Sequence, residues 1–270
     1  MKTIKFLLLA SILISFTNCQ KTNNTDKVDE NLQSNNREYY QLKVYTFDTD
    51  NQVATTDKYL ENAYLPALKN LGIKNIGVFK SKPNEKDSIK KTYVLIPFNS
   101  MEQFLPIEDS IHKYEDYLSK GNDYLNASYD NPPYKRMKST IMKAFIDMPK
   151  MQPSKLESPR SERVYELRSY ESPTEQYFTN KVDMFNAGGE IKLFESLKFN
   201  AVFYAEVISG AKMPNLMYMT TFENQVSREE HWKAFRESAK WNELKAMEKY
   251  QNNVSHIDIM FLYPTDYSDY

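Results

Sequence analysis

Short runs of alternating apolar and polar residues recur along the chain, separated by longer amphipathic stretches. Residues 39–47, YYQLKVYTF, alternate and are rich in aromatic side chains, which is typical of a β-strand. Stretches with apolar residues at helical spacing follow, and two more apolar runs have the length of strands. The elements predicted for this part of the chain are strand 39–47, helix 57–71, strands 76–82 and 92–98, helix 100–118 and strand 140–148.

The same pattern occurs a second time. Residues 161–171, SERVYELRSYE, repeat the first strand at a constant separation, and the matched pairs are Tyr40 with Tyr165, Leu42 with Leu167, Lys43 with Arg168 and Tyr45 with Tyr170. Self-similarity of this length indicates a duplicated domain. The elements predicted for the second copy are strand 164–170, a helix from Pro173 that Gly188 and Gly189 interrupt, strands 200–209 and 216–222, a helix from Ser227 and strand 254–263.

Capping boxes mark two of these helix starts. Ser227 with Glu230, and Ser172 with Glu175, have the spacing at which a hydroxyl accepts a free backbone amide while the carboxylate bonds back to the cap. Trp232 and residues one turn further along then provide an aromatic face that can pack on the sheet. Both helices are therefore expected to begin at a serine.

Each copy reads strand, helix, strand, strand, helix, strand, which predicts a four-stranded antiparallel sheet with helices on one face. Packing the two uncovered faces together buries both. The predicted fold is therefore α+β, with two tandem ferredoxin-like (βαββαβ) domains packed sheet to sheet as an intrachain dimeric α+β barrel. The predicted organisation is a signal peptide at 1–18, a disordered tether at 19–37, a first domain at 38–149, a linker at 150–160 and a second domain at 161–270.

The second copy contains the segments ERVYELRSYES, MFNAGGEIKLF, PNLMYMTTFEN and HWKAF. These segments resemble the NIPSNAP family in its bacterial tandem-domain form. The resemblance is strongest from Glu162 to the C-terminus and weaker over residues 39–149, where Tyr134 stands in the place of Trp241. It implies the same ferredoxin-like fold and dimeric α+β barrel, and it implies no catalytic residues, because the family has none established.

The N-terminus has the form of a bacterial export signal. Lys2 and Lys5 precede an apolar run, residues 6–16, that is too short to span a bilayer. Cys19, the one cysteine of the chain, stands where a lipoprotein carries its lipid, although Thr17 and Asn18 replace the usual small residues. A lipid-anchored protein of the cell envelope is the favoured interpretation, and plain secretion or an uncleaved anchor are the alternatives.

Charge and motifs exclude several classes of function. The chain has 35 basic and 36 acidic residues, whereas a nucleic-acid-binding protein needs a concentrated basic excess. His112, His231 and His256 have no metal-binding spacing, so neither a metal site nor a cofactor is expected. With a single cysteine, the chain cannot form an intramolecular disulfide.

Strand alternation predicts which side chains line the barrel. On the last strand, Ile257 and Ile259 suit the helices, which turns His256 and Asp258 inward. On the first strand of each copy the apolar positions are likewise expected to face the helices and the polar ones the barrel. The candidate ligand-binding residues of the barrel interior are Glu166, Arg168, Tyr170, His256, Asp258, Lys43 and Tyr45.

Buried charges must pair, be hydrated or meet a ligand, which leaves three interpretations of this set. It is an ion-pair network that fixes how the sheets dock, a small-molecule pocket, or a catalytic site. The function favoured by the sequence is that of a non-catalytic, envelope-anchored module that binds a small ligand or a protein partner. The sequence is also compatible with a homo-oligomer. The alternatives are a monooxygenase-like barrel enzyme for a hydrophobic or haem-like substrate, using His256 or Tyr170, and a purely structural lipoprotein.

Overall fold

The computed structural model describes residues 37–81 and 89–270, and every strand expected from the sequence is present. The predicted signal peptide at 1–18 and Cys19, with the tether as far as residue 36, lie outside the described residues. In the first half the elements are β1 (Tyr39–Phe47), α2 (Asp50–Tyr59), η1 (Leu60–Tyr64), α3 (Leu65–Asn70), β2 (Gly77–Ser81), β3 (Lys90–Phe98), α4 (Met101–Phe104), α5 (Ile107–Ile111), α6 (Glu115–Lys120), α7 (Asn122–Leu125) and β4 (Arg136–Ala144).

The second half repeats this order with fewer helix breaks, and no helix or strand lies in the predicted linker at 150–160. Across the described ranges, no helix is both long enough and apolar enough to cross a lipid bilayer. The elements of the second half are β5 (Val164–Glu171), α8 (Glu175–Phe185), α9 (Glu190–Ser196), β6 (Asn200–Ser209), β7 (Asn215–Phe222), α10 (Gln225–Glu237), α11 (Ala239–Ala246), η2 (Glu248–Tyr250) and β8 (His256–Pro264).

The eight strands close into one antiparallel barrel in the order β1-β3-β2-β8-β5-β7-β6-β4. The four strands of each half are neighbours, and hydrogen bonds from β2 to β8 and from β4 to β6 join the two groups. The mixed α+β fold expected from the sequence is confirmed. The two sheets are joined at both edges rather than only stacked, which pairs backbone groups that free edge strands would expose.

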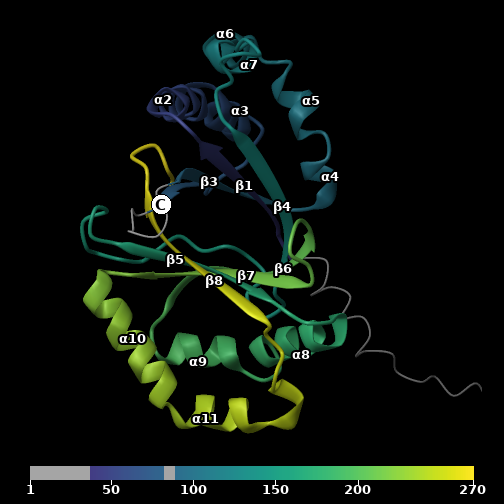
Figure 1. Cartoon of the computed structure of the whole chain (residues 1–270), viewed down its shortest axis with the longest axis vertical. Coiled ribbons are helices and arrows are strands. Elements are labelled where there is room, and N and C mark those ends of the chain that lie inside the picture. The colour runs from purple at the N-terminus through teal and green to yellow at the C-terminus, as the bar shows by residue number, and fades with distance from the viewer. Residues whose placement is uncertain (1–36, 82–88) are drawn as a thin grey trace, which may run out of the picture.

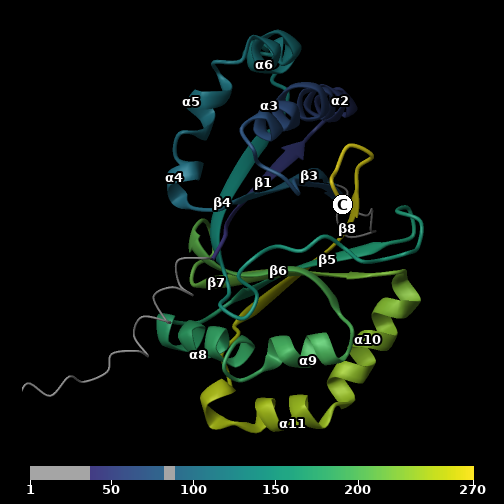
Figure 2. The same cartoon turned by 180° about the vertical axis from the view of Figure 1, so that it is seen from behind.

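Helices cover the barrel on two opposite sides. Figure 1 shows α2 to α7 over the strands of the first half and α8 to α11 over those of the second, and Figure 2 shows the same two layers from behind. Three apolar clusters result: one inside the barrel, with Tyr165, Leu167 and Leu262 among its members, and one under each helix layer. The barrel interior is therefore a packed core.

Several boundaries differ from the prediction because of local breaks and caps. The first helix begins at Asp50, where Thr49 accepts a hydrogen bond from the Gln52 amide. The expected helix 100–118 is split, and Pro106, which has no amide hydrogen to donate, lies at the first break. Strand β4 begins at Arg136, four residues before the predicted strand, and α7 forms between the predicted helix 100–118 and the predicted strand 140–148, where no helix was predicted.

The two helix caps also differ from the prediction. Asn224, not Ser227, caps α10, and its side chain accepts the Ser227 amide at 2.9 Å. Thr174 precedes α8, while the Ser172 hydroxyl donates to the Asn253 carbonyl at 2.7 Å. Asn and Ser cap helices equally well, so the residue type could not show whether Asn224 or Ser227 caps α10. The interruption at Gly188 and Gly189 is confirmed, and Gly189 adopts the left-handed region with φ 87°.

Candidate functional site

Glu166, Arg168 and Tyr170 lie on the outer face of β5, under the helices. Glu166 bonds to side chains of α10, and Tyr170 packs in the apolar cluster under α8 and α9. The prediction that these three residues point into the barrel is therefore wrong. The neighbouring Tyr165 and Leu167 lie in the apolar cluster inside the barrel instead, whereas helix α10 supplies the counter-ion Arg228 to Glu166.

The Glu166 network, which we define as Glu166, Arg168, Tyr170, Arg228 and Trp232, satisfies its buried charges completely. The Glu166 carboxylate, whose side chain is 0% exposed, accepts from Arg168 Nε at 2.7 Å, Arg228 Nε at 2.8 Å and Trp232 Nε1 at 2.8 Å. The Arg168 guanidinium also lies 3.7 Å from the centre of the Trp232 ring and donates to the Tyr170 hydroxyl at 3.0 Å.

The protonation state of Glu166 follows from these contacts. Burial raises the pKa of its carboxyl, but the hydrogen bond from Arg228 and the charges of Arg168 and Arg228 outweigh burial and lower the pKa below its usual value. The carboxylate is thus ionised at neutral pH, and both of its oxygens are engaged. This geometry suits an ion-pair network that fixes α10 on the sheet. The i, i+4 spacing of Arg228 and Trp232 on one helix face was the sequence signal for it.

Lys43 and Tyr45 occupy the equivalent outer face of β1, so their predicted place inside the barrel is also wrong. Lys43 Nζ donates to the Tyr64 hydroxyl at 2.6 Å and to Glu108 at 2.9 Å, both from the helix layer. Tyr45 packs in the cluster under the first helices, while Leu42 lies inside the barrel. Each half therefore buries one cation of the repeat, Lys43 or Arg168, against its helices.

His256 and Asp258 lie on the barrel-facing side of β8 at the rim, where the strand begins. With Glu171 and Lys212 they form what we call the rim cluster. His256 Nε2 lies 3.1 Å from Asp258 Oδ1, and Lys212 Nζ lies 2.6 Å from Asp258 and 3.1 Å from Glu171. The hydrogen bond from Lys212 lowers the pKa of Asp258. Ligand binding by any of the seven candidate residues stays a prediction.

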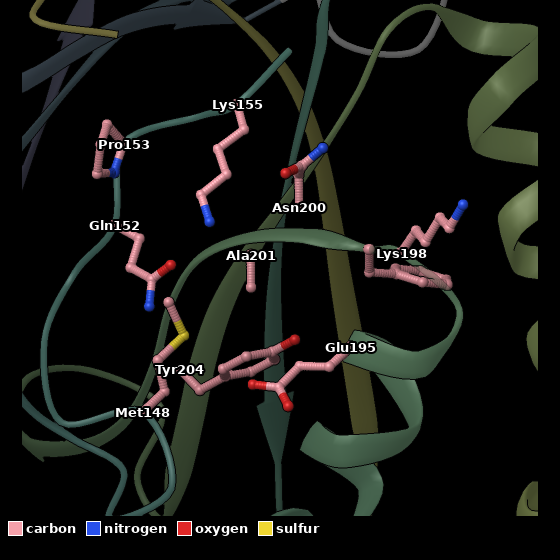
Figure 3. A pocket seen from close by; sticks show the side chains of 10 residues that line it. Met148, Gln152, Pro153, Lys155, Glu195, Lys198, Asn200, Ala201 and Tyr204 are labelled. Atoms are coloured by element: carbon pink, nitrogen blue, oxygen red, sulfur yellow. The ribbon is translucent and has the colours of Figure 1, made fainter.

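A pocket of about 380 Å³ opens between residues 148–155, the end of α9 and the start of β6 (Figure 3). We call it the linker pocket. Figure 3 shows Gln152 and Lys155 reaching in from the linker, with Glu195 of α9 across from them. Sequence reasoning missed this site because its residues come from three separate segments. They are Met148, Gln152, Pro153, Lys155, Glu195, Lys198, Phe199, Asn200, Ala201 and Tyr204.

Tyr204 gives the linker pocket a hydrogen-bond donor without an acceptor. Its hydroxyl is buried and makes no hydrogen bond within the described part of the chain. Burial, reinforced by the charges of Glu190 and Glu195, raises the pKa of Tyr204 well above its ordinary value, so the phenol stays protonated. Lys155 and Lys198 outnumber Glu195 in the lining, which makes the pocket net positive. Such a set can hold an anionic group and an acceptor oxygen.

The sequence profile of the NIPSNAP family matches residues 165–269, a range that includes the Glu166 network, the rim cluster and six of the ten residues that line the linker pocket. The second half of the chain belongs to the NIPSNAP family. This confirms the resemblance seen in the sequence. No curated protein matches this chain in sequence.

The barrel of the chain is similar to solved structures at low sequence identity. A candidate monooxygenase of Fusobacterium nucleatum is 8% identical, with a TM-score of 0.54 over 84% of this chain and 92% of the other. One of Lactobacillus acidophilus is 10% identical (84% and 94% covered, TM-score 0.49). A NIPSNAP family protein of Agrobacterium tumefaciens is 17% identical, with 40% of this chain and 97% of that chain covered and a TM-score of 0.34. The Fusobacterium likeness shows a shared fold alone.

Proposed function

We propose that this NIPSNAP chain is an envelope-anchored lipoprotein that binds a small organic anion in the linker pocket and does not transform it. The observation that carries the proposal is the pocket itself, whose volume of about 380 Å³ falls in the range of small-molecule sites, roughly 300 to 1,000 Å³. Its buried Tyr204 hydroxyl supplies a donor that a ligand oxygen would satisfy.

The lining suggests the chemistry of the ligand. Lys155 and Lys198 attract a carboxylate or a phosphate, while Glu195 favours a ligand that also carries a hydroxyl or an amine. Met148 and Phe199 are buried and add an apolar wall. A hydroxy acid or an amino acid combines these features. The saturated Glu166 carboxylate has no lone pair directed at a substrate, which favours binding over acid-base catalysis at that position.

Binding through the linker pocket makes a direct prediction for two variants. Lys155→Ala is expected to weaken the binding of a small hydroxy acid about tenfold, because it removes a charge-assisted contact, and Tyr204→Phe several-fold, because it removes the donor. Isothermal titration calorimetry with L-malate and L-glutamate as probes measures both. Lys233→Ala, an exposed lysine of α10, is the matched control. The proposal fails if the wild type binds neither probe class, or if Lys155→Ala binds as well as Lys233→Ala.

The membrane attachment is proposed from the N-terminal sequence, which lies outside the described residues. A lipid on Cys19 would tether the barrel to the envelope through buried acyl methylenes, at about 0.8 kcal/mol each. Cys19→Ser is therefore expected to move the protein from the membrane to the soluble fraction of fractionated cells. Continued membrane association of that variant would rule out the lipid anchor without affecting the proposal for the linker pocket.

We also infer that the barrel is a tandem pair of ferredoxin-like domains within one chain. The strand orders β4-β1-β3-β2 and β8-β5-β7-β6 are equivalent when each half is numbered on its own, which supports a duplication. The matched cations Lys43 and Arg168, each at the centre of its half and under its helices, support the same inference.

A monooxygenase-like activity is the second candidate, because the Fusobacterium neighbour with a similar fold is described as a candidate monooxygenase. In this interpretation the substrate would be hydrophobic or haem-like. Absorbance in the Soret region of natively purified protein, and oxygen uptake with added haem, test it. Neither a Soret band nor oxygen uptake is expected if the linker pocket is a binding site alone.

A further inference from the structure

We propose that the rim cluster is a binding site for a divalent transition-metal cation, with Glu171, His256 and Asp258 as ligands and Lys212 as the group that the ion displaces. The inference is independent of the linker pocket and revises the expectation, drawn from histidine spacing, that the protein has no metal site. It starts from the pairing of β5 with β8, which brings distant residues together.

Strand register places the three ligands on one face. Glu171 lies directly opposite His256, and Asp258 follows two residues later on the same side of β8. One ligand atom from each residue lies within 4.8 Å of the others. Ligands of a zinc ion at about 2.0 to 2.2 Å from the metal lie closer together than this, so small side-chain rotations complete the site. One imidazole with two carboxylates suits a first-row divalent ion such as Zn²⁺.

Asn215 adds a second, independent observation. It begins β7 directly opposite Glu171, is 2% exposed, and its Oδ1 makes no hydrogen bond within residues 37–81 and 89–270. Its Nδ2 donates to the Ser169 hydroxyl at 2.8 Å, deeper in the barrel. The pairing with Glu171 places this acceptor at the same end of the barrel as the rim cluster. A buried acceptor without a donor, next to the Glu171 carboxylate, is a group that a cation would satisfy.

Lys212 already brings a positive charge to the rim cluster, but this charge does not balance both carboxylates. Its ammonium lies between Asp258 and Glu171, at 2.6 and 3.1 Å, and contributes one positive charge against two negative ones. A divalent ion balances both carboxylates. Lys212 is half exposed and stands in the short connection between β6 and β7, so its side chain can swing into solvent when the ion enters.

Zinc titration of the full chain tests the site by competition with a chromophoric chelator. All proteins carry Cys19→Ser, which removes the one thiol of the chain. We expect His256→Ala to weaken zinc binding at least about tenfold, as loss of a ligand does, and Asp258→Asn to weaken it as well. Lys212→Ala is expected to tighten binding about tenfold, because it removes a competing charge.

His231→Ala, a histidine outside the rim cluster, is the matched control and is expected to bind zinc as the parent does. The increase with Lys212→Ala separates this site from loose association of zinc with any surface histidine. The proposal is overturned if the parent protein binds no zinc, if His256→Ala and His231→Ala behave alike, or if Lys212→Ala weakens binding. Circular dichroism confirms that each variant is folded.

Discussion

Replacing Arg168 by alanine is expected to destabilise the folded chain by about 3 to 5 kcal/mol, the cost of breaking a buried ion pair from one side. The substitution removes the hydrogen bonds to Glu166 and Tyr170 and the stacking of the guanidinium on Trp232. It leaves the buried Glu166 carboxylate with Arg228 and Trp232 alone. A loss of this size lowers the melting temperature by roughly 10 °C in a chain of this length.

Arg236→Ala is the matched control, because Arg236 lies on α10 and its side chain is exposed. Its effect is expected to stay within about 0.5 kcal/mol. Thermal and urea melts followed by circular dichroism measure both variants. Equal melting temperatures for Arg168→Ala and Arg236→Ala would show that the Glu166 network does not hold α10 on the sheet.

The second large effect is expected at the buried pair formed by Lys181 of α8 and Glu190 of α9. Their side chains are 5% and 3% exposed and are joined at 2.8 Å. Lys181→Met is expected to cost about 3 to 5 kcal/mol, because it strands the Glu190 carboxylate in an apolar, aromatic environment that includes Phe185. The double variant Lys181→Met with Glu190→Leu is expected to recover most of that loss, since no charge is left unpaired.

A double-mutant cycle from urea melts gives the coupling free energy of the two residues. The exposed pair of Lys240 and Glu243 on α11 is the control, and removing either of its partners is expected to cost less than about 1 kcal/mol. If the double variant at 181 and 190 is as unstable as the sum of its single variants, the pair acts through packing rather than through charge.

The number of strands, the α+β class and the interrupted helix at Gly189 could be predicted because alternation, helical spacing and glycine breaks are local features. Which side chains of β5 face the barrel interior and which face the helices could not be predicted. Both faces of that strand are buried, so the polar residues Glu166 and Arg168 carried no information on which side held their partners. Those partners, Arg228 and Trp232, lie more than 60 positions away in the sequence.

The linker pocket and the rim cluster could not be predicted from the sequence for a related reason. The linker pocket depends on how residues 148–155 cross the end of α9, and the rim cluster depends on the register between β5 and β8. His256 and Asp258 could be recognised as polar residues at the start of a strand. Glu171 and Lys212 joined them only once the chain had folded, because long-range pairing determines these contacts.

The two seams that join the halves, β2 with β8 and β4 with β6, have a consequence for the evolution of such chains. A half that was separated from the other would expose two unpaired strand edges and the apolar inner surface of its sheet. Two identical halves could rebuild the ring around a twofold axis, but every position would then be used twice. In the duplication that we infer, fusing the two copies frees them to diverge, so one gene can keep a lysine at the centre of one half and an arginine at the centre of the other.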